Sequence, residues 1–340
     1  MVYLSFLNVI FGTGRDFDGV AIPNLFGTGR DIYWYGIIIA FGVLVAFLLA
    51  QYDVKRRGLP KDTATDMVIW ALIPAVIFAR LYYVIFDPNH SFTSFMDIID
   101  ISKGGLAIYG GVIGGAIGIF AYSKYKKIKF TTLLDIAAPC LAIGQAFGRW
   151  GNFMNQEAFG NPVTDPGMQW FPYAVYFPNP KGGFDAGWFQ ATFFYESMWC
   201  LLICIFILIY RKRQRFSGEL ALWYFLLYGI ERTFVELLRQ DQLILMDTGI
   251  PVSSLLSAVL VIASAVLLIL GFLQFKKGKL TPATPGSIYY VPAIDSDNTK
   301  AENVSETCDE QIQETTAPEE NEQNVNGEQN AEPDEDSQHV

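Results

Sequence analysis

Seven long stretches of the chain are almost continuously apolar, and each is close to the ~20 residues that a helix needs to cross a bilayer. They cover residues 32–52, 66–86, 104–123, 132–150, 191–210, 219–238 and 252–275. Polar and charged residues are concentrated in the connections between them. The pattern predicts an all-α integral membrane protein with seven transmembrane helices.

The third stretch is rich in glycine. Gly110, Gly114 and Gly118 recur every four residues, and Gly111 and Gly115 stand beside them. Small residues at this spacing let two helices approach closely in lipid. We interpret these glycines as a packing face.

Lysine and arginine are concentrated in alternate connections. The basic clusters lie in residues 55–61, 124–129, 211–215 and 276–279, whereas the other connections hold little more than Lys103, Lys181 and Arg239. Basic residues mark the cytoplasmic side of a membrane protein. The N-terminus is therefore expected outside and the C-terminus in the cytoplasm, which agrees with an odd number of spans.

Three segments are predicted outside the bilayer. Residues 1–31 form an extracytoplasmic N-terminal segment, in which Phe-Gly-Thr-Gly-Arg-Asp occurs at 11–16 and again at 26–31. Residues 32–275 form the transmembrane domain, and its loop 151–190, with five prolines and several aromatic residues, is expected to fold as an external cap between the fourth and fifth helices. Residues 276–340 are expected to be a disordered acidic cytoplasmic tail.

Composition supports this division. Of the 340 residues 51% are hydrophobic and 17% are charged, with a mean hydropathy of +0.27. Residues 295–340 contain 15 acidic residues and one lysine, so the rest of the chain has 23 basic and 19 acidic residues. The four cysteines and two histidines show no disulfide framework and no spacing typical of a metal site. We expect no metal, no other cofactor and no nucleic-acid partner.

The fourth stretch ends in a polar motif, Gly148-Arg149-Trp150-Gly151-Asn152-Phe153-Met154-Asn155-Gln156-Glu157-Ala158-Phe159-Gly160. The glycines allow the backbone to approach a ligand closely. The guanidinium of Arg149 matches a phosphate or carboxylate, and the amides and Glu157 supply further hydrogen bonds. The plain alternative is a polar helix end that turns into a loop.

Polar groups from six stretches share one depth near the predicted outer surface. They are Tyr35, Arg80, Tyr109, Arg149, Asn152, Asn155, Glu157, Glu196, Tyr228, Arg232, Glu236 and the following Arg239. The inner halves, by contrast, carry few charged residues. Ionisable groups are costly in a bilayer, and several arginines at one outer-leaflet pocket suggest a phosphorylated headgroup. The alternative is a salt-bridge network, such as Arg232 with Glu236 or Glu196, that only locks the bundle.

Over residues 33–275 the chain resembles bacterial prolipoprotein diacylglyceryl transferases. The motif that carries the resemblance is Gly148-Arg149-x-Gly151-Asn152-Phe153-x-Asn155-x-Glu157-x-x-Gly160. Supporting matches are Trp34-Tyr35-Gly36, Ala79-Arg80-Leu81-Tyr82-Tyr83, Tyr195-Glu196-Ser197 and Tyr228-Gly229-x-x-Arg232-x-x-x-Glu236-x-x-Arg239. Members of this family have seven transmembrane helices with the N-terminus outside.

The resemblance implies an enzyme of the bacterial cell membrane that catalyses the first step of lipoprotein maturation. The diacylglyceryl group of phosphatidylglycerol would pass to the lipobox cysteine thiol in the signal peptide of a prolipoprotein, forming a thioether and releasing glycerol phosphate. Phosphatidylglycerol, the prolipoprotein and membrane lipids are the implied partners. The nucleophile comes from the substrate, so the enzyme needs no catalytic serine or cysteine.

The resemblance also implies roles for individual residues. The expected catalytic residues are Arg149, Arg232, Glu236, Tyr35 and Tyr109. The expected substrate-binding residues are Arg149, Asn152, Asn155, Glu157, Gly160, Tyr228, Arg80, Glu196 and Arg239. Arg149 would hold the phosphate, with Asn152 and Glu157 orienting it, and Arg232 would stabilise charge on the leaving group.

Three positions depart from the family pattern. Tyr109 and Gln190 stand where the family usually has histidine, and Phe78 stands where glycine is common. A tyrosine hydroxyl is a poor base at neutral pH. We therefore expect Tyr109 to orient the substrate, while Glu236, Glu157 or solvent takes the thiol proton. Two other functions stay open: a transporter or binding protein for an anionic lipid, and a paralogue that binds its ligands without catalysis.

Overall fold

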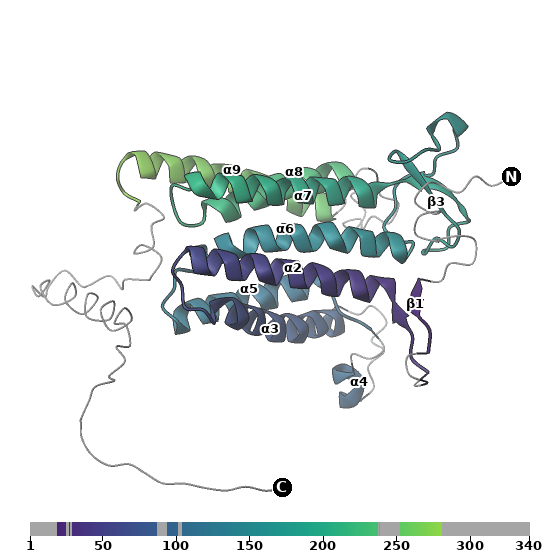
Figure 1. The fold of residues 1–340 in the computed structure, drawn as a ribbon, viewed down its shortest axis with the longest axis horizontal. Coiled ribbons are helices and arrows are strands. Elements are labelled where there is room, and N and C mark those ends of the chain that lie inside the picture. Colours follow the sequence, from purple (N-terminus) through teal and green to yellow (C-terminus); the bar gives the residue numbers. More distant parts are fainter. Residues whose placement is uncertain are drawn as a thin grey trace, which may run out of the picture. The chain divides into compact units, whose positions relative to one another are not determined.

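The computed structural model describes residues 19–24, 27, 29–86, 94–100, 104–236, 238 and 252–280. Within these ranges seven helices have 18 residues or more, and together they account for the seven apolar stretches (Figure 1). They are α2 (Trp34–Arg56), α3 (Thr63–Ile85), α5 (Ile108–Tyr125), α6 (Phe130–Met154), α7 (Thr192–Tyr210), α8 (Glu219–Glu236) and α9 (Val252–Lys276). Shorter helices are α4 (Phe95–Ile99), η2 (Pro166–Met168) and η3 (Arg211–Arg213).

In the ranges described, two small β-hairpins accompany the helices. Strand β1 (Val20–Ile22) pairs antiparallel with β2 (Ile32–Tyr33), immediately before α2. Strand β3 (Ala174–Phe177) pairs antiparallel with β4 (Gly187–Gln190), with Phe177 opposite Gly187. The second hairpin lies in the 151–190 loop, whose aromatic core packs onto Phe153 and Phe193 at the adjoining ends of α6 and α7. The loop is therefore folded, with strands that the sequence did not predict, and it is called the cap below; its position outside the membrane stays a prediction.

The glycine face of α5 packs against α3. A Cβ atom added to Gly114 would lie 2.3 Å from the carbonyl oxygen of Pro74, and one added to Gly118 would lie 1.8 Å from that of Trp70. Gly110 approaches α3 as closely. These distances leave no room for a side chain, so the predicted packing role of the three glycines is confirmed.

Helix α6 is the central helix of the bundle. It packs against α2 on one side and α7 on the other, and it also contacts α8, which in turn packs against α9 (Figure 1). About half of its membrane-length segment is buried, with Leu133, Ile136 and Ala142 fully enclosed. The polar motif at its end therefore starts from the interior of the bundle rather than from its surface.

The outer faces of the helices are apolar and exposed. Leu72, Ile73 and Ile77 of α3, for example, are each 58% exposed, as expected for side chains that contact lipid. In the described part of the chain, five helices are long and apolar enough to cross a membrane: α2, α3, α6, α7 continued by η3, and α9. The fold is that of a helical membrane protein. Of the other two long helices, α5 is rich in glycine and α8 carries several charged side chains.

A buried polar cluster lies at the basic ends of the helices, where the connections rich in lysine and arginine join them. Asp53 accepts hydrogen bonds from Arg57 at 2.7 Å and Arg211 at 3.1 Å. Gln214 joins Arg57 to the fully buried Asp135, whose carboxylate it contacts at 2.6 Å. Of the charged residues named here, only Asp135 lies within a predicted apolar stretch. These residues lie at helix ends and in short connections, where a sequence does not show which side chains turn inward.

Candidate functional site

Three helices bring four of the predicted site residues into one chain of ion pairs. Arg149 of α6 contacts Oε2 of Glu196 on α7 at 2.6 Å, and Arg232 of α8 contacts the same oxygen at 3.0 Å. Arg232 also reaches Glu236, one turn further along α8, at 3.0 Å. Both ion pairs that the sequence suggested for Arg232 are present, and Glu196 connects the two arginines.

The ion-pair chain is shielded from solvent. Glu196 is 1% exposed, and the side chains of Arg149 and Arg232 are 17% and 14% exposed. Two guanidinium groups and two carboxylates compensate each other, as buried charges require. In the described part of the chain, these contacts use only some of the five N–H donors of each guanidinium. The two guanidinium groups therefore retain further N–H donors beside the Glu196 carboxylate.

The register of α6 against α7 positions the first of these pairs. Trp150 donates its indole N–H to the Ser197 hydroxyl at 3.1 Å, and Ser197 donates to the carbonyl oxygen of Ala146 at 3.0 Å. Trp150 and Ser197 are the immediate neighbours of Arg149 and Glu196 in the sequence. The hydrogen bonds between them hold the two helices so that the ionic side chains meet.

The turn after α6 brings the remaining motif residues together. Gln156 and Ala158 have φ values of +53° and +55°, in the left-handed region that side chains other than glycine seldom adopt. The reversal points Glu157 back at the helix end. There its Oε1 accepts hydrogen bonds from the amides of Asn152 at 3.0 Å and Asn155 at 3.2 Å.

Two tyrosines complete the surroundings of the arginines. Tyr35, in the first turn of α2, lies against Gly151, where an added Cβ would be 2.7 Å from its ring. It is close enough to Arg149 for an electrostatic interaction. Tyr228 of α8 stacks on Tyr224 with ring centroids 5.7 Å apart, and it interacts electrostatically with both arginines.

Comparison with known proteins places this arrangement in a family. The family model for prolipoprotein diacylglyceryl transferase matches residues 23–270. This chain belongs to the prolipoprotein diacylglyceryl transferase family. A phosphatidylglycerol–prolipoprotein diacylglyceryl transferase of Oceanobacillus iheyensis is 41% identical over 241 residues, which cover 70% of this chain and 84% of the relative. One from Finegoldia magna is 40% identical over 70% of this chain and 91% of its own length, and one from Bacillus cytotoxicus is 44% identical over 63% and 79%.

Two residues of the transferase motifs lie outside the ion-pair chain. Arg80 of α3 donates hydrogen bonds to the backbone carbonyls of Ile98 at 2.7 Å, Gly104 at 2.9 Å and Gly105 at 3.0 Å. It therefore anchors the segment that leads into α5. Tyr109, in the first turn of α5, is half-buried and its ring lies 6.4 Å from that of Tyr82. Among the described residues it makes no hydrogen bond to the arginines or their carboxylates.

Gly160 and Gln190 lie together in the cap. The backbone N–H of Gly160 donates to the carbonyl of Gln190 at 3.1 Å, and an added Cβ would be 2.8 Å from the Gln190 side chain. The Gln190 amide in turn donates to the Tyr173 hydroxyl at 3.3 Å. The role of Gly160 in substrate binding stays a prediction. Arg239 lies outside the described residues.

Sequence reasoning gave no role to three residues at this end of the bundle. Ser197 holds α6 against α7, as described above. Glu231 is 5% exposed on α8 and interacts electrostatically with Arg232. The sequence feature that could have identified it is a charged residue inside an apolar stretch. Lys181 of the cap forms an ion pair with Glu157 at 3.7 Å. The sequence feature that could have identified Lys181 is that it is the only basic residue between Arg149 and Arg211.

Proposed function

We propose that this protein transfers the diacylglyceryl group of phosphatidylglycerol to the lipobox cysteine of a prolipoprotein. The cysteine sulfur forms a bond to the glyceryl carbon that carries the phosphate ester. The carbon–oxygen bond to the phosphate breaks, glycerol phosphate leaves with the bonding electrons, and the thiol proton passes to a base. Family membership and the names of relatives that are about 40% identical support this reaction.

The observation that carries the proposal is the meeting of Arg149 and Arg232 on Glu196. A lipid phosphate has the same charge sign and the same paired oxygen geometry as the Glu196 carboxylate. It can therefore bind to the remaining N–H donors of the two guanidinium groups. As the carbon–oxygen bond breaks, negative charge grows on the phosphate. Pre-positioned donors in a site shielded from water stabilise that charge more than they stabilise the bound lipid.

Three groups stay candidates for the thiol proton: Glu236, Glu157 and solvent. Glu236 is nearly buried and is held by Arg232, whereas Glu157 is 33% exposed and is held by two asparagine amides. Each carboxylate is already a hydrogen-bond acceptor in the structure. Tyr109, in place of the usual histidine, has the role of orienting substrate rather than of accepting the proton.

The reaction sets the orientation that we propose for the chain. All seven long helices span the bacterial cell membrane, with residues 1–31 and the 151–190 cap outside and residues 276–340 in the cytoplasm. The basic connections then face the cytoplasm and the arginine site faces the outer leaflet. A prolipoprotein whose signal peptide crosses the membrane presents its cysteine at that surface.

The test uses the purified full-length chain in micelles that contain phosphatidylglycerol, with a lipobox peptide and detection of the diacylglyceryl peptide by mass spectrometry. Arg149→Ala is expected to lower the rate by about 100-fold or more, because it removes a donor to the developing charge. Arg213→Ala, an exposed arginine at the basic end, serves as the control and is expected to leave the rate unchanged.

Thermal unfolding of both variants checks that each is folded. If the unaltered protein forms no product but still binds phosphatidylglycerol through Arg149, the transferase proposal is refuted. The result would then favour a non-catalytic paralogue or an anionic-lipid binding protein.

A further inference from the structure

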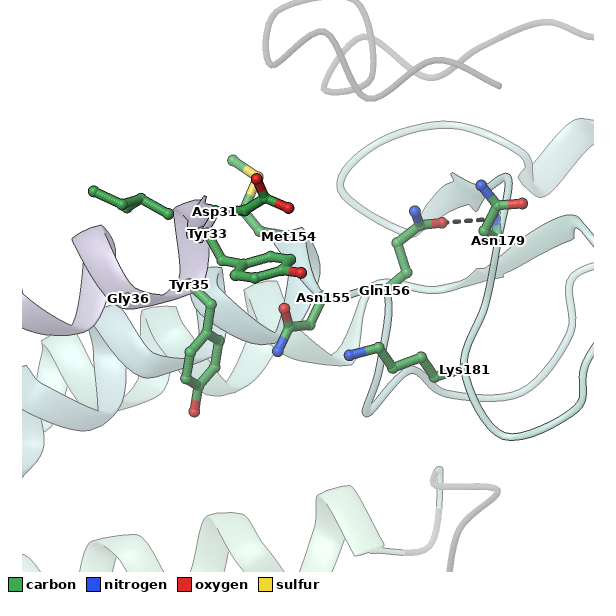
Figure 2. Close-up of a pocket in the computed structure, with 10 residues that line it drawn as sticks. Asp31, Tyr33, Tyr35, Gly36, Met154, Asn155, Gln156, Asn179 and Lys181 are labelled. Atoms are coloured by element: carbon green, nitrogen blue, oxygen red, sulfur yellow. Dashed lines mark hydrogen bonds between the residues drawn. The ribbon is translucent and has the colours of Figure 1, made fainter. Parts of the chain in front are cut away.

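A cavity of about 890 Å³ opens beside the arginine site, between the start of α2, the end of α6 and the cap. Its walls come from three parts of the chain that are distant in sequence (Figure 2). They are residues 31–33, 35 and 36, residues 154–156, and the cap residues Asn179 and Lys181. The volume is in the range of small-molecule binding sites.

The lining of the cavity combines apolar surface with polar groups of mixed charge. Lys181 provides a cation, Asn155 and Asn179 provide amides, Tyr35 provides a phenol, and Asp31 provides a carboxylate. Figure 2 shows the Lys181 side chain extending toward Asn155 across the cavity. A cation beside neutral donors binds a phosphate, whereas a carboxylate and amides bind hydroxyl groups. The combination matches a small phosphorylated polyol.

The backbone of Lys181 is held in place, whereas its ammonium group is only weakly held. Its N–H donates to the carbonyl of Gln156 at 2.9 Å, and the Asn179 N–H donates to the Gln156 side chain at 2.8 Å (Figure 2). The ammonium group, by contrast, lies 3.7 Å from Glu157 in an ion pair whose members are 58% and 33% exposed. Exposed pairs of this length are weak. The ammonium group can therefore exchange the Glu157 carboxylate for another anion.

The cavity is connected to the arginines by a row of polar side chains. Arg149 has a long contact of 3.5 Å with Asn152, which donates to Glu157. Glu157 in turn accepts from Asn155, a residue of the cavity wall. Between Arg149 and Lys181 the amides of Asn152 and Asn155 can donate to a phosphate, whereas the Glu157 carboxylate can only accept from its hydroxyl groups.

We infer that this cavity is the subsite that receives glycerol phosphate after the carbon–oxygen bond has broken, with Lys181 as its phosphate ligand. The inference rests on the proposed function, because that reaction produces glycerol phosphate. While it is esterified in the lipid, the phosphate stays with Arg149 and Arg232. Once free, it moves to Lys181, and its hydroxyl groups contact Asp31 and Asn155. The departure of the product toward the aqueous side frees the arginines for the next lipid.

The test measures binding of free glycerol 1-phosphate to the full-length protein in detergent micelles by calorimetry, together with its inhibition of transfer. Lys181→Ala is expected to weaken both about five- to tenfold, because one charge-assisted contact is lost. Lys181→Arg is expected to keep both within about threefold of the unaltered protein. Lys61→Ala, an exposed lysine at the basic end, is the control and should change neither.

Two further measurements distinguish binding of the phosphate in the lipid from binding of the free glycerol phosphate. Binding of phosphatidylglycerol in nanodiscs, and the KM for the lipobox peptide, should stay within about twofold in Lys181→Ala, because the arginines hold the lipid. Unchanged glycerol phosphate binding in Lys181→Ala overturns the inference. So does weaker lipid or peptide binding without an effect on glycerol phosphate. If the protein catalyses no transfer but binds glycerol phosphate through Lys181, the proposed function fails and the subsite remains.

Discussion

The contact between α3 and α5 allows a sharp test within a single pair of neighbouring glycines. Gly114 and Gly115 are adjacent on α5, but they face different surroundings. An added Cβ at Gly114 would lie 2.3 Å from the carbonyl oxygen of Pro74 and 2.8 Å from Cβ of Phe78. An added Cβ at Gly115 would meet its nearest atoms, in Ala71 and Ala75, at 3.9 Å, which is ordinary contact.

The two alanine variants share one effect and differ in another. Both gain helix propensity, worth at most about 1 kcal/mol. Only Gly114→Ala forces the backbones of α3 and α5 apart, by roughly 1 Å to restore contact distance, and overpacking of this kind costs ~1–3 kcal/mol. We therefore expect Gly114→Ala to be less stable than Gly115→Ala by about 1–3 kcal/mol, and Gly115→Ala to match or exceed the unaltered protein.

The measurement is the unfolding of both variants by SDS in mixed micelles, followed by circular dichroism, with the transfer rate recorded in parallel. The shared propensity effect cancels in the difference between the variants. A difference below about 0.5 kcal/mol would refute the reasoning, because that is the usual size of the effect at a site without a specific contact.

Three further substitutions address the site. Glu196→Gln removes the carboxylate between the two arginines, so we expect a loss of about 3 kcal/mol in unfolding free energy and of most transfer activity; unchanged SDS unfolding would contradict this. Gly151→Ala pushes the ring of Tyr35 aside and is expected to lower the transfer rate about tenfold by misplacement, whereas Gly144→Ala, with open space around it, should not; equal rates would count against the contact. Tyr109→Phe should keep near-normal turnover, and a loss of several orders of magnitude would make its hydroxyl essential.

Hydrophobicity was sufficient to locate the helices but not all of their ends. Each of the seven apolar stretches corresponds to a long helix. Helix α6 continues to Met154, four residues beyond its predicted end, because polar residues do not interrupt helical hydrogen bonds. Arg149 and Asn152 are therefore three residues apart on one helix face. The β-hairpins escaped prediction because β2 has only two residues and β3 and β4 have four each, too few for a clear alternation.

The sequence predicted which residues form the site better than it predicted which ion pairs they make. Ionisable residues in apolar stretches identified Arg149, Glu196 and Arg232 because such residues are costly in lipid. The sequence could not show that one oxygen of Glu196 serves both arginines, because this depends on the register of α6, α7 and α8. Nor could it show that Lys181 returns to the end of α6, because that contact depends on the fold of the cap.

The position of α6 has a consequence for how the protein is made. Of the described helices α2 is synthesised first, yet it packs mainly against α6, which begins 74 residues after α2 ends. At ~5–20 residues per second the ribosome needs several seconds to reach it. During that interval Asp53 of α2 lacks Arg211, which belongs to η3 and is synthesised later still. Arg57, one turn away at 2.7 Å, already compensates its charge. The nascent chain therefore carries a counter-ion for Asp53 within its own next turn, before the other helices are made.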